Sequence, residues 1–437
     1  MALGGGIWTR QDKVLPGAYT VFSNAKKANA ALSSRGIVAL PIALDFGETG
    51  KVFEVSREDF MTKSKELFGY RVDDDRMRNL REVFLHATKV LVYRLVSADA
   101  TAASNTLATA KYVGKRGNDI KIVVGANVDK PSAFDVGTYL DNALVDNQTV
   151  DNMAGLKDNA YVTFKSSATL SVTAGMPLSG GTSGGNLTGE IYTKALESFE
   201  AYSFNILCCP VIDSTITKLF VAYTKRLRDE VGSKFQTVVY KSDSDYEGII
   251  SINNDVVGTD KNSLVYWVSG AEAGCEVNKS LTNAVYDGEY EVVTDYKQSQ
   301  LEAAIKQGKF TLHNVNGDVR VLEDINSFVS FKVDKDSMFS SNQTIRVIDQ
   351  IANDIAALFN TRYLGVVPND NAGRISLWND ICKIHQELEK LRAIESFDTK
   401  SVEVVQGDDK KSVLCTINGI DTVSYTHLRA HETRHDL

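Results

Sequence analysis

Several signals are missing from this 437-residue sequence. No apolar run approaches the ~20 residues that a membrane-spanning helix needs. The first residues, MALGGGIWTRQDK, contain no apolar core of the length found in a signal peptide. CxxC pairs are also missing, and the cysteines are odd in number: Cys208, Cys209, Cys275, Cys382 and Cys415. We therefore interpret them as reduced, mostly buried thiols of a protein made in a cytoplasm.

An excess of positive charge is absent too. Lys and Arg number 48 against 56 Asp and Glu, which gives a formal net charge of -8 at pH 7. Broad nucleic-acid binding needs a basic face that displaces counterions, so this balance argues against it. The hydrophobic content of 43% and the charged content of 24% are typical of a globular protein. The length is sufficient for about two to four domains.

The pattern of residue types divides the chain into regions. Residues 31–97 alternate apolar strands with helices, which predicts the first part of an α/β domain. The run 89–96 predicts a buried strand, and the stretch 57–69 predicts a helix with Gly69 just past its end. Residues 98–185 are rich in Thr, Ser, Asn, Asp and Gly and contain short alternating runs at 119–125, 161–166 and 169–175, which predicts an inserted all-β domain. Strands and helices alternate again in residues 186–330, the predicted second part of the same domain. The stretch 214–232 predicts a helix that begins at a serine and ends at Gly232.

The last structured region is predicted to be an α+β C-terminal domain over residues 331–423. Its first helix carries one apolar stripe, made of Ile348, Ile351, Ile355, Leu358 and Phe359. Its second helix carries another, made of Trp378, Ile381, Ile384, Leu388 and Leu391. Residues 401–420 predict a hairpin with GDDKK as its turn. The whole chain is therefore predicted to be an α+β, multidomain protein.

Two features favour assembly. The first region, residues 1–30, holds one strand-like stretch, VLPGAYTVF (14–22). A single short strand cannot satisfy its own backbone, so it must add to a sheet in this chain or in a neighbour. The predicted helix 262–275 is rich in small residues, including Gly270 and Gly274, which allow close backbone approach. Such approach suits either a domain core or a contact between subunits, and the sequence does not separate the two.

Two short motifs suggest chemistry, and each has a simpler interpretation. GTSGG (181–185) fits the pattern of a nucleophile elbow, but that elbow needs a strand ending at Ser183 and a helix starting at once. A polar stretch intervenes and no histidine is placed as a base, which favours a plain connector. DSDYEG (243–248) begins like a calcium loop, yet Asn254 stands where a bidentate carboxylate is required. An acidic turn is the better interpretation.

Two further motifs are similarly weak. GKRGND (114–119) is a basic, glycine-bearing turn that could hold an anion, but a solvated loop is favoured. Cys382 and His385 have C-x-x-H spacing on a helix, near its apolar stripe. Without other paired ligands nearby in sequence, a packed thiol and a satisfied histidine are favoured over a metal site. We therefore predict no catalytic residues, no cofactor and no metal.

Several long stretches resemble one known family. WVSGAEAGCEVNKSLTNAVYDG (267–288) resembles the signature of contractile tail sheath proteins from phages and prophages of Gram-positive bacteria and from phage-tail-like bacteriocins. Further stretches resemble that family in the same order: LPGAYTVF near the start, AKYVGKRGNDIKIVV in the inserted domain, YTKALESFEAYSFNILCCP after it, and IDQIANDIAALFNTRYLGVVPNDNAGRISLWNDI in the C-terminal domain. The resemblance runs from about residue 10 to residue 423.

The resemblance implies a mechanical function without a nucleotide. Sheath subunits stack as six-membered rings around a tail tube, and their contraction drives the tube through the target cell envelope. The implied partners are copies of the chain itself, the tail tube protein, and baseplate and tail terminator proteins, with no nucleic acid and no direct membrane insertion. The implied location is the virion tail, after assembly in the cytoplasm of the bacterial host.

The resemblance also assigns residues. The N-terminal arm would exchange strands between subunits through Leu15, Pro16, Gly17, Ala18, Tyr19, Thr20, Val21 and Phe22. The C-terminal domain is innermost in the family, so Lys383, Lys390 and Arg392 are candidates for tube contact. Their alternative interpretation, the solvated face of an amphipathic helix, is favoured.

The last residues, 424–437, depart from the family. His427, His431 and His435 lie four residues apart, a spacing that would stack three imidazoles on one helix face. The stretch SYTHLRAHETRHDL is polar, however, and stands where the family has its last strand. It resembles translated sequencing-adapter tails, so we expect a non-native tail without a metal site. Without the last strand, a sheet edge would be exposed and the chain would assemble poorly.

Two rival functions stay open at this point. The first is a self-assembling tube or layer protein that does not contract, and only the family resemblance disfavours it. The second, which has less support, is an α/β hydrolase that uses Ser183 or an Asp/His pair. It would require a nucleophile and a base at the ends of strands, and the sequence offers no such arrangement.

Overall fold

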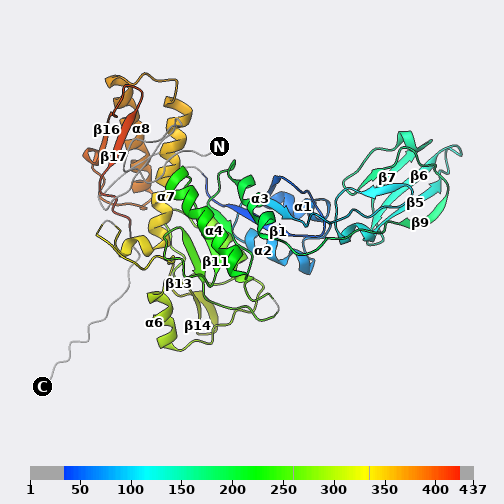
Figure 1. Cartoon of the computed structure of the whole chain (residues 1–437), viewed down its shortest axis with the longest axis horizontal. Coiled ribbons are helices and arrows are strands. Elements are labelled where there is room, and N and C mark those ends of the chain that lie inside the picture. Colours follow the sequence, from blue (N-terminus) through cyan, green and yellow to red (C-terminus); the bar gives the residue numbers. More distant parts are fainter. Residues whose placement is uncertain (1–33, 259, 334, 424–437) are drawn as a thin grey trace.

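The computed structural model describes residues 34–258, 260–333 and 335–423. Figure 1 shows an elongated molecule with the C-terminal domain at one end, a central domain in the middle and a β domain at the far end. None of the helices in these described residues has the length and apolar content needed to cross a bilayer. The predicted class, a multidomain α+β fold with an inserted β domain, is confirmed.

The central domain is built on a seven-stranded sheet of order β13-β12-β11-β10-β1-β3-β2. Only β2 (Val52–Ser56), at one edge, runs antiparallel to its neighbour. The six parallel strands are β1 (Ile37–Ala43), β3 (Lys89–Leu95), β10 (Ile206–Cys208), β11 (Gln236–Tyr240), β12 (Ile249–Ile252) and β13 (Lys309–Phe310). The strands read as apolar runs because helices cover both faces of this sheet.

Alternate residues of β1 enter two separate cores. Val38 and Leu40 face α1 (Arg57–Phe68), α2 (Arg78–Phe84) and α5 (Leu264–Gly274). Ala39 faces the opposite core, which is completed by two further helices, α3 (Gly189–Phe199) and α4 (Ser214–Arg226). The remaining elements of this domain are α6 (Gln298–Lys306), β14 (Leu312–Val315) and β15 (Asp318–Val321).

The small residues of α5 lie in the core of the central domain. A Cβ atom added to Gly270 would stand 2.4 Å from the carbonyl oxygen of Val83, and one added to Gly274 would stand 2.4 Å from that of His86. Both carbonyls belong to α2 or the turn after it. The close backbone approach therefore joins two helices of one domain. Of the two interpretations that the sequence left open, a domain core and a contact between subunits, the structure supports the domain core.

The inserted domain contains a four-stranded antiparallel sheet of order β7-β6-β5-β9 and a two-stranded one. Its strands are β4 (Ala108–Ala110), β5 (Ile120–Ala126), β6 (Phe134–Leu140), β7 (Ala143–Val150), β8 (Val162–Phe164) and β9 (Thr173–Pro177). The runs at β5, β8 and β9 were predicted, but β4, β6 and β7 were missed. Strands β6 and β7 form a hairpin whose two-residue turn, Asp141-Asn142, has positive φ at both residues. Asp and Asn are favoured in such two-residue turns, so the pair Asp141-Asn142 was the sequence signal for this hairpin.

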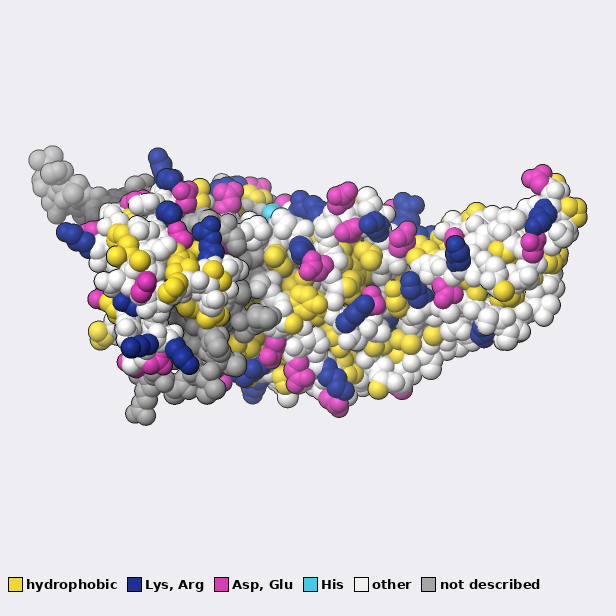
Figure 2. All heavy atoms as spheres, turned by 90° about the horizontal axis from the view of Figure 1, so that it is seen from above, with side chains coloured by type: hydrophobic (Ala, Val, Ile, Leu, Met, Phe, Trp, Pro, Cys, Tyr) yellow, Lys and Arg dark blue, Asp and Glu magenta, His cyan; other side chains and the backbone are white. Residues whose placement is uncertain are grey.

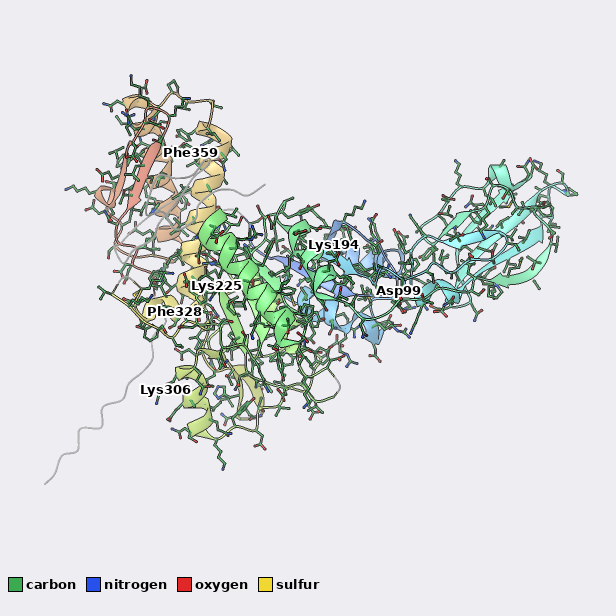
Figure 3. All side chains as sticks on the ribbon, in the orientation of Figure 1. Asp99, Lys194, Lys225, Lys306, Phe328 and Phe359 are labelled. Atoms are coloured by element: carbon green, nitrogen blue, oxygen red, sulfur yellow. The ribbon has the colours of Figure 1, made fainter. Side chains whose placement is uncertain are left out.

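The chain enters and leaves the inserted domain through a paired stalk. Thr101 pairs with Thr182, and Ser104 pairs with Ser179, each as an isolated antiparallel bridge. Asp99, at the start of this stalk, lies between the central and inserted domains in Figure 3. Side chains from both domains contact each other at this junction.

Arg116 fixes the junction from inside, so the predicted solvated loop at 114–119 is wrong for this residue. Its side chain is 6% exposed. Nε donates to the carbonyl oxygen of Gly69 at 2.9 Å, and Nη1 donates to Asp141 at 2.7 Å. The guanidinium also lies 4.2 Å from the ring centroid of Tyr70. Gly69 ends α1 in the left-handed conformation, as its position after the predicted helix indicated.

The C-terminal domain packs two helices on a hairpin. These elements are α7 (Asn342–Leu358), α8 (Asn371–Lys390), β16 (Val402–Gln406) and β17 (Val413–Ile417). Of the predicted apolar stripe of α7, Ile348, Ile351 and Ile355 are buried. Leu358, the last residue of α7, and Phe359, just after it, are partly buried against the C-terminal core. On α8, Ile381, Ile384 and Leu388 are buried as predicted, but Leu391 is 44% exposed because α8 ends at Lys390. Leu377, one turn before Ile381, is buried in the same core.

Candidate assembly surfaces

The hairpin β16–β17 buries one face and leaves the other partly open. Val402 and Val404, opposite Ile417 and Cys415, pack into the C-terminal core. The indole Nε1 of Trp378 on α8 donates to the carbonyl oxygen of Val402 at 2.8 Å, which ties the hairpin to the helix. The predicted turn at 407–411 is present, with Asp409 accepting backbone hydrogen bonds from Lys411 and Ser412.

Both outer edges of this hairpin lack a strand partner among the described residues. The sheet contains β16 and β17 alone. A two-stranded sheet is marginal in water, and its unpaired backbone groups form a template for another strand. Val405 on the face turned away from α8 is 37% exposed. The described part of the chain therefore presents a sheet that is ready for β-augmentation.

The candidate tube-facing residues lie at the surface of the C-terminal domain. Lys383 and Lys390 are on α8, with side chains 69% and 68% exposed, and Arg392 is exposed just after the helix. Lys383 pairs with Asp380 at 2.8 Å, and Lys390 pairs with Glu387 at 2.5 Å. The helix face is thus close to charge-balanced and is not a basic stripe. Over the visible middle of the molecule, charges of both signs also intermingle (Figure 2).

A buried charge cluster joins α7 to the central domain. The Arg346 guanidinium lies 2.6 Å from Glu272 of α5 and 3.3 Å from Asp324. All three side chains are at most 1% exposed. Asn342 donates to both carboxylates, at 3.1 and 2.9 Å, and Arg346 also donates to the carbonyl oxygen of Lys279 at 2.7 Å. Burial, together with the nearby Asp324, raises the pKa of Glu272 well above its ordinary value.

A second buried ion pair joins the same helix to the central domain one turn further on. Arg228, in the turn after α4, binds both oxygens of Asp349, with Nη2 to Oδ1 at 2.8 Å. The two side chains are 5% and 7% exposed. Asn353 adds a backbone contact, since its Nδ2 donates to the carbonyl oxygen of Lys234 at 2.8 Å. Two buried pairs on successive turns fix the angle between the two domains.

Sequence reasoning missed this cluster. Glu272 stands alone as a charge inside the small, apolar helix α5, and Arg346 stands near the start of an apolar helix. A single charge in an apolar helix requires a buried partner, so Glu272 was the sequence signal for a buried ion pair. The partners could not be chosen from sequence because Arg346 lies 74 residues from Glu272 and 22 from Asp324.

The acidic side chains of the stretch 243–248 make contacts within the protein. Asp243 pairs with Lys309, and Glu247 pairs with Lys335. Asp245 accepts the backbone N–H groups of Val329 and Ser330 at 2.8 and 3.0 Å. The described residues contain no group of three or more His, Cys, Asp or Glu placed to hold a metal ion. The interpretation of this stretch as an acidic turn agrees with these contacts.

The remaining sequence motifs have structural contacts. The Ser183 hydroxyl accepts the backbone N–H of Lys115 at 3.3 Å, beside the stalk. The Cys382 thiol is buried, and burial raises its pKa to about 11, which disfavours the thiolate that binds metals. His385 is fully buried, shares a 2.8 Å hydrogen bond with the Ile381 carbonyl oxygen and stacks on Phe397. Burial strongly lowers the pKa of His385, so the ring is neutral.

Two sets of predicted residues lie outside the described residues. The arm strand, from Leu15 to Phe22, belongs to the first 33 residues, and His427, His431 and His435 belong to residues 424–437. The strand-exchange and non-native-tail predictions therefore stay predictions.

Profiles of four phage tail sheath domains match almost all of the described chain. They are the tail sheath protein Gp18 domain III N-terminal region (residues 35–95), the phage tail sheath protein beta-sandwich domain (97–183), the phage tail sheath protein central domain (185–327) and the phage tail sheath C-terminal domain (334–424).

Individual proteins agree with these profiles. Phage-like element PBSX protein XkdK of Bacillus subtilis is 35% identical over 381 residues, which are 80% of this chain and 81% of that protein. The solved sheath tail protein from Desulfitobacterium hafniense is 36% identical, with a TM-score of 0.77 over 89% of this chain and 93% of that one. The sheath tail protein from Listeria innocua is 32% identical, with a TM-score of 0.80 over 91% and 94%.

Proposed function

The chain belongs to the phage tail sheath protein family, and on that premise we propose that it polymerises around a tail tube and contracts. Subunits stack as six-membered rings, and their contraction drives the tube through the target envelope. The partners are further copies of the chain, the tail tube protein, and baseplate and tail terminator proteins. The protein is assembled in the host cytoplasm and acts in a phage, prophage or bacteriocin tail.

One observation supports the proposed linkage between subunits: among the described residues, the β16–β17 hairpin has no strand at either outer edge. The stretch 14–22 has a strand pattern but no neighbouring strand in sequence. The hairpin has no third strand among the described residues. Strand addition between subunits satisfies both, because main-chain hydrogen bonds give affinity and alternate side chains give register. Subunits linked in this way stay connected while they reorient relative to one another.

The buried ion pairs support contraction by rigid bodies. A sheath that shortens while staying connected needs subunits that remain rigid and contacts between subunits that can rearrange. The pairs Arg346–Glu272 and Arg228–Asp349 hold the central and C-terminal domains together with almost no solvent contact. Opening either would leave a charge unpaired in the interior, which costs about 3–5 kcal/mol. We therefore expect each subunit to keep the angle between its central and C-terminal domains during contraction.

The tube contact remains a proposal for the exposed face of α8 and the residue after it. Lys383 and Lys390 already have carboxylate neighbours on the same helix. We therefore assign the larger electrostatic contribution to Arg392, which is exposed in a left-handed conformation after the helix. Arg392→Gln should weaken co-sedimentation with the tube protein more than Lys383→Gln does.

Electron microscopy of proline variants tests the linkage. Tyr19→Pro and Val21→Pro each remove a backbone donor from the arm strand, while Ala28→Pro changes the linker and serves as the matched control. All forms carry an apolar terminal strand in place of residues 424–437, because the chain with its given tail is expected to assemble poorly. In this background we expect rings or tubes from the parent and the control, and monomers of unchanged stability from the strand variants. Assembly of Tyr19→Pro and Val21→Pro with parental efficiency would refute strand exchange through this arm.

The same images test contraction. Tubes formed around a tail tube and then treated with mild denaturant should convert to a shorter and wider form. Tubes of one fixed diameter under every condition would favour the rival, non-contractile tube. The hydrolase alternative has less support, because the described histidines lie after α2, in β14 and in α8, away from Ser183.

A further inference from the structure

Two buried acidic side chains lie together where α7 meets the central domain. Glu272 belongs to α5, and Asp324 lies between β15 and α7. Both accept hydrogen bonds from the same two nitrogen atoms. Asn342 Nδ2 lies 3.1 Å from Glu272 and 2.9 Å from Asp324. Arg346 Nη2 lies 2.6 and 3.3 Å from the same two groups. Because they share both donors, the two carboxyl groups form one buried cluster.

Among the described residues, one cation contacts the carboxyl oxygens of this pair, and it is Arg346. Arg35 also approaches, but its guanidinium donates to the main-chain carbonyl oxygens of Cys275 and Glu272, at 3.1 and 3.3 Å. Two ionised carboxylates would therefore leave one negative charge in excess among the side chains in contact. Such an excess is costly in the interior of a protein.

The other groups around the pair do not supply the missing positive charge. On α7, Asp349 is bound to Arg228, and that ion pair has no net charge. At the end of α5, burial raises the pKa of Cys275 to about 11, so its thiol is neutral. After α5, Lys279 offers Arg346 its main-chain carbonyl oxygen, while its ammonium pairs with Glu276 at the surface. One proton bound to the pair would balance its charge.

The two acids differ in their further contacts. Asp324 accepts additional hydrogen bonds from the backbone N–H of Leu281 at 2.9 Å and from the hydroxyl of Ser280 at 3.3 Å. Burial disfavours its ionisation, but the Arg346 guanidinium and these donors together lower the pKa of Asp324. The hydrogen bonds given above for the Glu272 carboxyl come from the two shared donors. Burial and the neighbouring Asp324 raise the pKa of Glu272. The proton therefore belongs on Glu272.

We propose that Glu272 and Asp324 hold one proton between them at neutral pH, and that this proton stabilises the packing of α7 on the central domain. Glu272 carries the proton toward Asp324, and Arg346 balances the charge that remains on Asp324. Release of the proton at alkaline pH places two like charges side by side and weakens the contact between the two domains. This inference concerns the single subunit and rests neither on assembly nor on contraction.

Infrared spectroscopy of the full chain tests where the proton lies. A protonated carboxyl group has a C=O stretching band that a carboxylate lacks, and isotopic labelling of glutamate identifies bands from that residue type. Glu82 is a second buried glutamate with a raised pKa, so the relevant component is the one that Glu272→Gln removes. We expect this component at neutral pH in the parent and in the control Glu54→Gln, whose side chain is 53% exposed. An unchanged band in Glu272→Gln would overturn the proposal.

The variant Asp324→Asn separates sharing of the proton from simple burial, and it also serves if Glu272→Gln does not fold. It removes the negative charge that favours protonated Glu272 but leaves Glu272 buried beside Arg346. If the two acids share the proton, the Glu272 band should weaken by at least about half at neutral pH. A band of parental intensity would show that burial alone holds the proton, and sharing would be refuted.

Urea denaturation across a range of pH measures the contribution to stability. An ordinary glutamate loses its proton near pH 4.5, but folded Glu272 keeps its proton to higher pH. The parent therefore loses stability as the pH rises between these two values. Relative to Glu272→Gln, the unfolding constant of the parent should increase about tenfold per pH unit above about pH 5, until folded Glu272 ionises. The ratio cancels the contribution of His385, which both proteins contain. A ratio that does not change with pH would contradict the proposal.

Hydrogen exchange locates the effect. Opening of the contact exposes Glu272 to water, where it ionises more readily as the pH rises. At about pH 8, the amides in the first two turns of α7 should exchange at least about threefold faster in the parent than in Glu272→Gln, and at about pH 5 the two rates should agree. Strand β5 of the inserted domain lies outside this contact and should show no difference. Equal rates in α7 at both pH values would refute the role of the proton in this packing.

Discussion

The contact between α2 and α5 offers the sharpest test of how this fold is packed. Gly270→Ala would place a methyl group 2.4 Å from the carbonyl oxygen of Val83, which is backbone and cannot rotate away. The helices would have to separate, at a cost near the upper end of the ~1–3 kcal/mol range for overpacking. Alanine gains about 1 kcal/mol over glycine in a helix interior. We therefore expect Gly270→Ala to lower the free energy of unfolding by about 2 kcal/mol.

A matched substitution makes this test specific. At Gly189, the first residue of α3, an added Cβ would lie 3.7 Å from Ile216, an ordinary contact. Gly189→Ala should therefore leave stability unchanged or raise it by up to about 1 kcal/mol. Urea denaturation followed by tryptophan fluorescence measures the change, and Trp267, a buried residue of α5, is one of the three tryptophans that contribute.

Two outcomes would refute the reasoning. If Gly270→Ala stabilises the protein as Gly189→Ala does, the two helices are not in tight contact. If Gly270→Ala leaves stability unchanged but abolishes ring or tube formation, the small residues of α5 serve a contact between subunits. Either result would reopen the alternative that the sequence alone left undecided.

Three further changes should each have a distinct signature. Arg346→Met leaves two buried carboxylates without their cation and should cost about 3–5 kcal/mol in urea denaturation; a loss below about 1 kcal/mol would contradict the buried pairing. Burial lowers the pKa of His385 below its unfolded value, so stability should fall by about 1.4 kcal/mol per pH unit as the pH drops below about 6.5. His385→Asn should flatten that dependence, and an unchanged slope would show that other groups cause it. Arg116→Leu should loosen the inserted domain and broaden the maximum dimension measured by X-ray scattering, whereas an unchanged profile would show that the stalk alone fixes the junction.

Local signals predicted most of the helices and the central strands. Gly69 and Gly232 end their helices in the left-handed conformation, and each was visible as a glycine after an amphipathic run. The apolar run at 89–96 became β3 because a strand buried on both faces needs no alternation. The hairpin at 401–420 was also predicted, since its turn residues and its alternating strands are contiguous in sequence.

The failures have a common cause. Strands β6 and β7 contain Asp and Asn at positions that only their pairing makes favourable, so their composition indicated a loop. The Arg116 turn looked solvated because its partners, Gly69 and Asp141, lie 47 and 25 residues away. The role of Arg346 in joining the two domains was missed for the same reason, because its partners Glu272 and Asp324 are also distant in sequence. Of the assembly surface, the sequence indicated the lone strand and the hairpin, but the angle between domains depends on contacts that no local pattern contains.

The paired stalk has a consequence for how such chains change over generations. Because the bridges Thr101–Thr182 and Ser104–Ser179 bring the two crossings side by side, the inserted domain begins and ends at almost one place. Its removal or replacement would leave the order of the seven central strands intact. Recombination could thus exchange this outlying module while preserving the lattice-forming body, and a foreign domain with adjacent termini could be grafted at the same position.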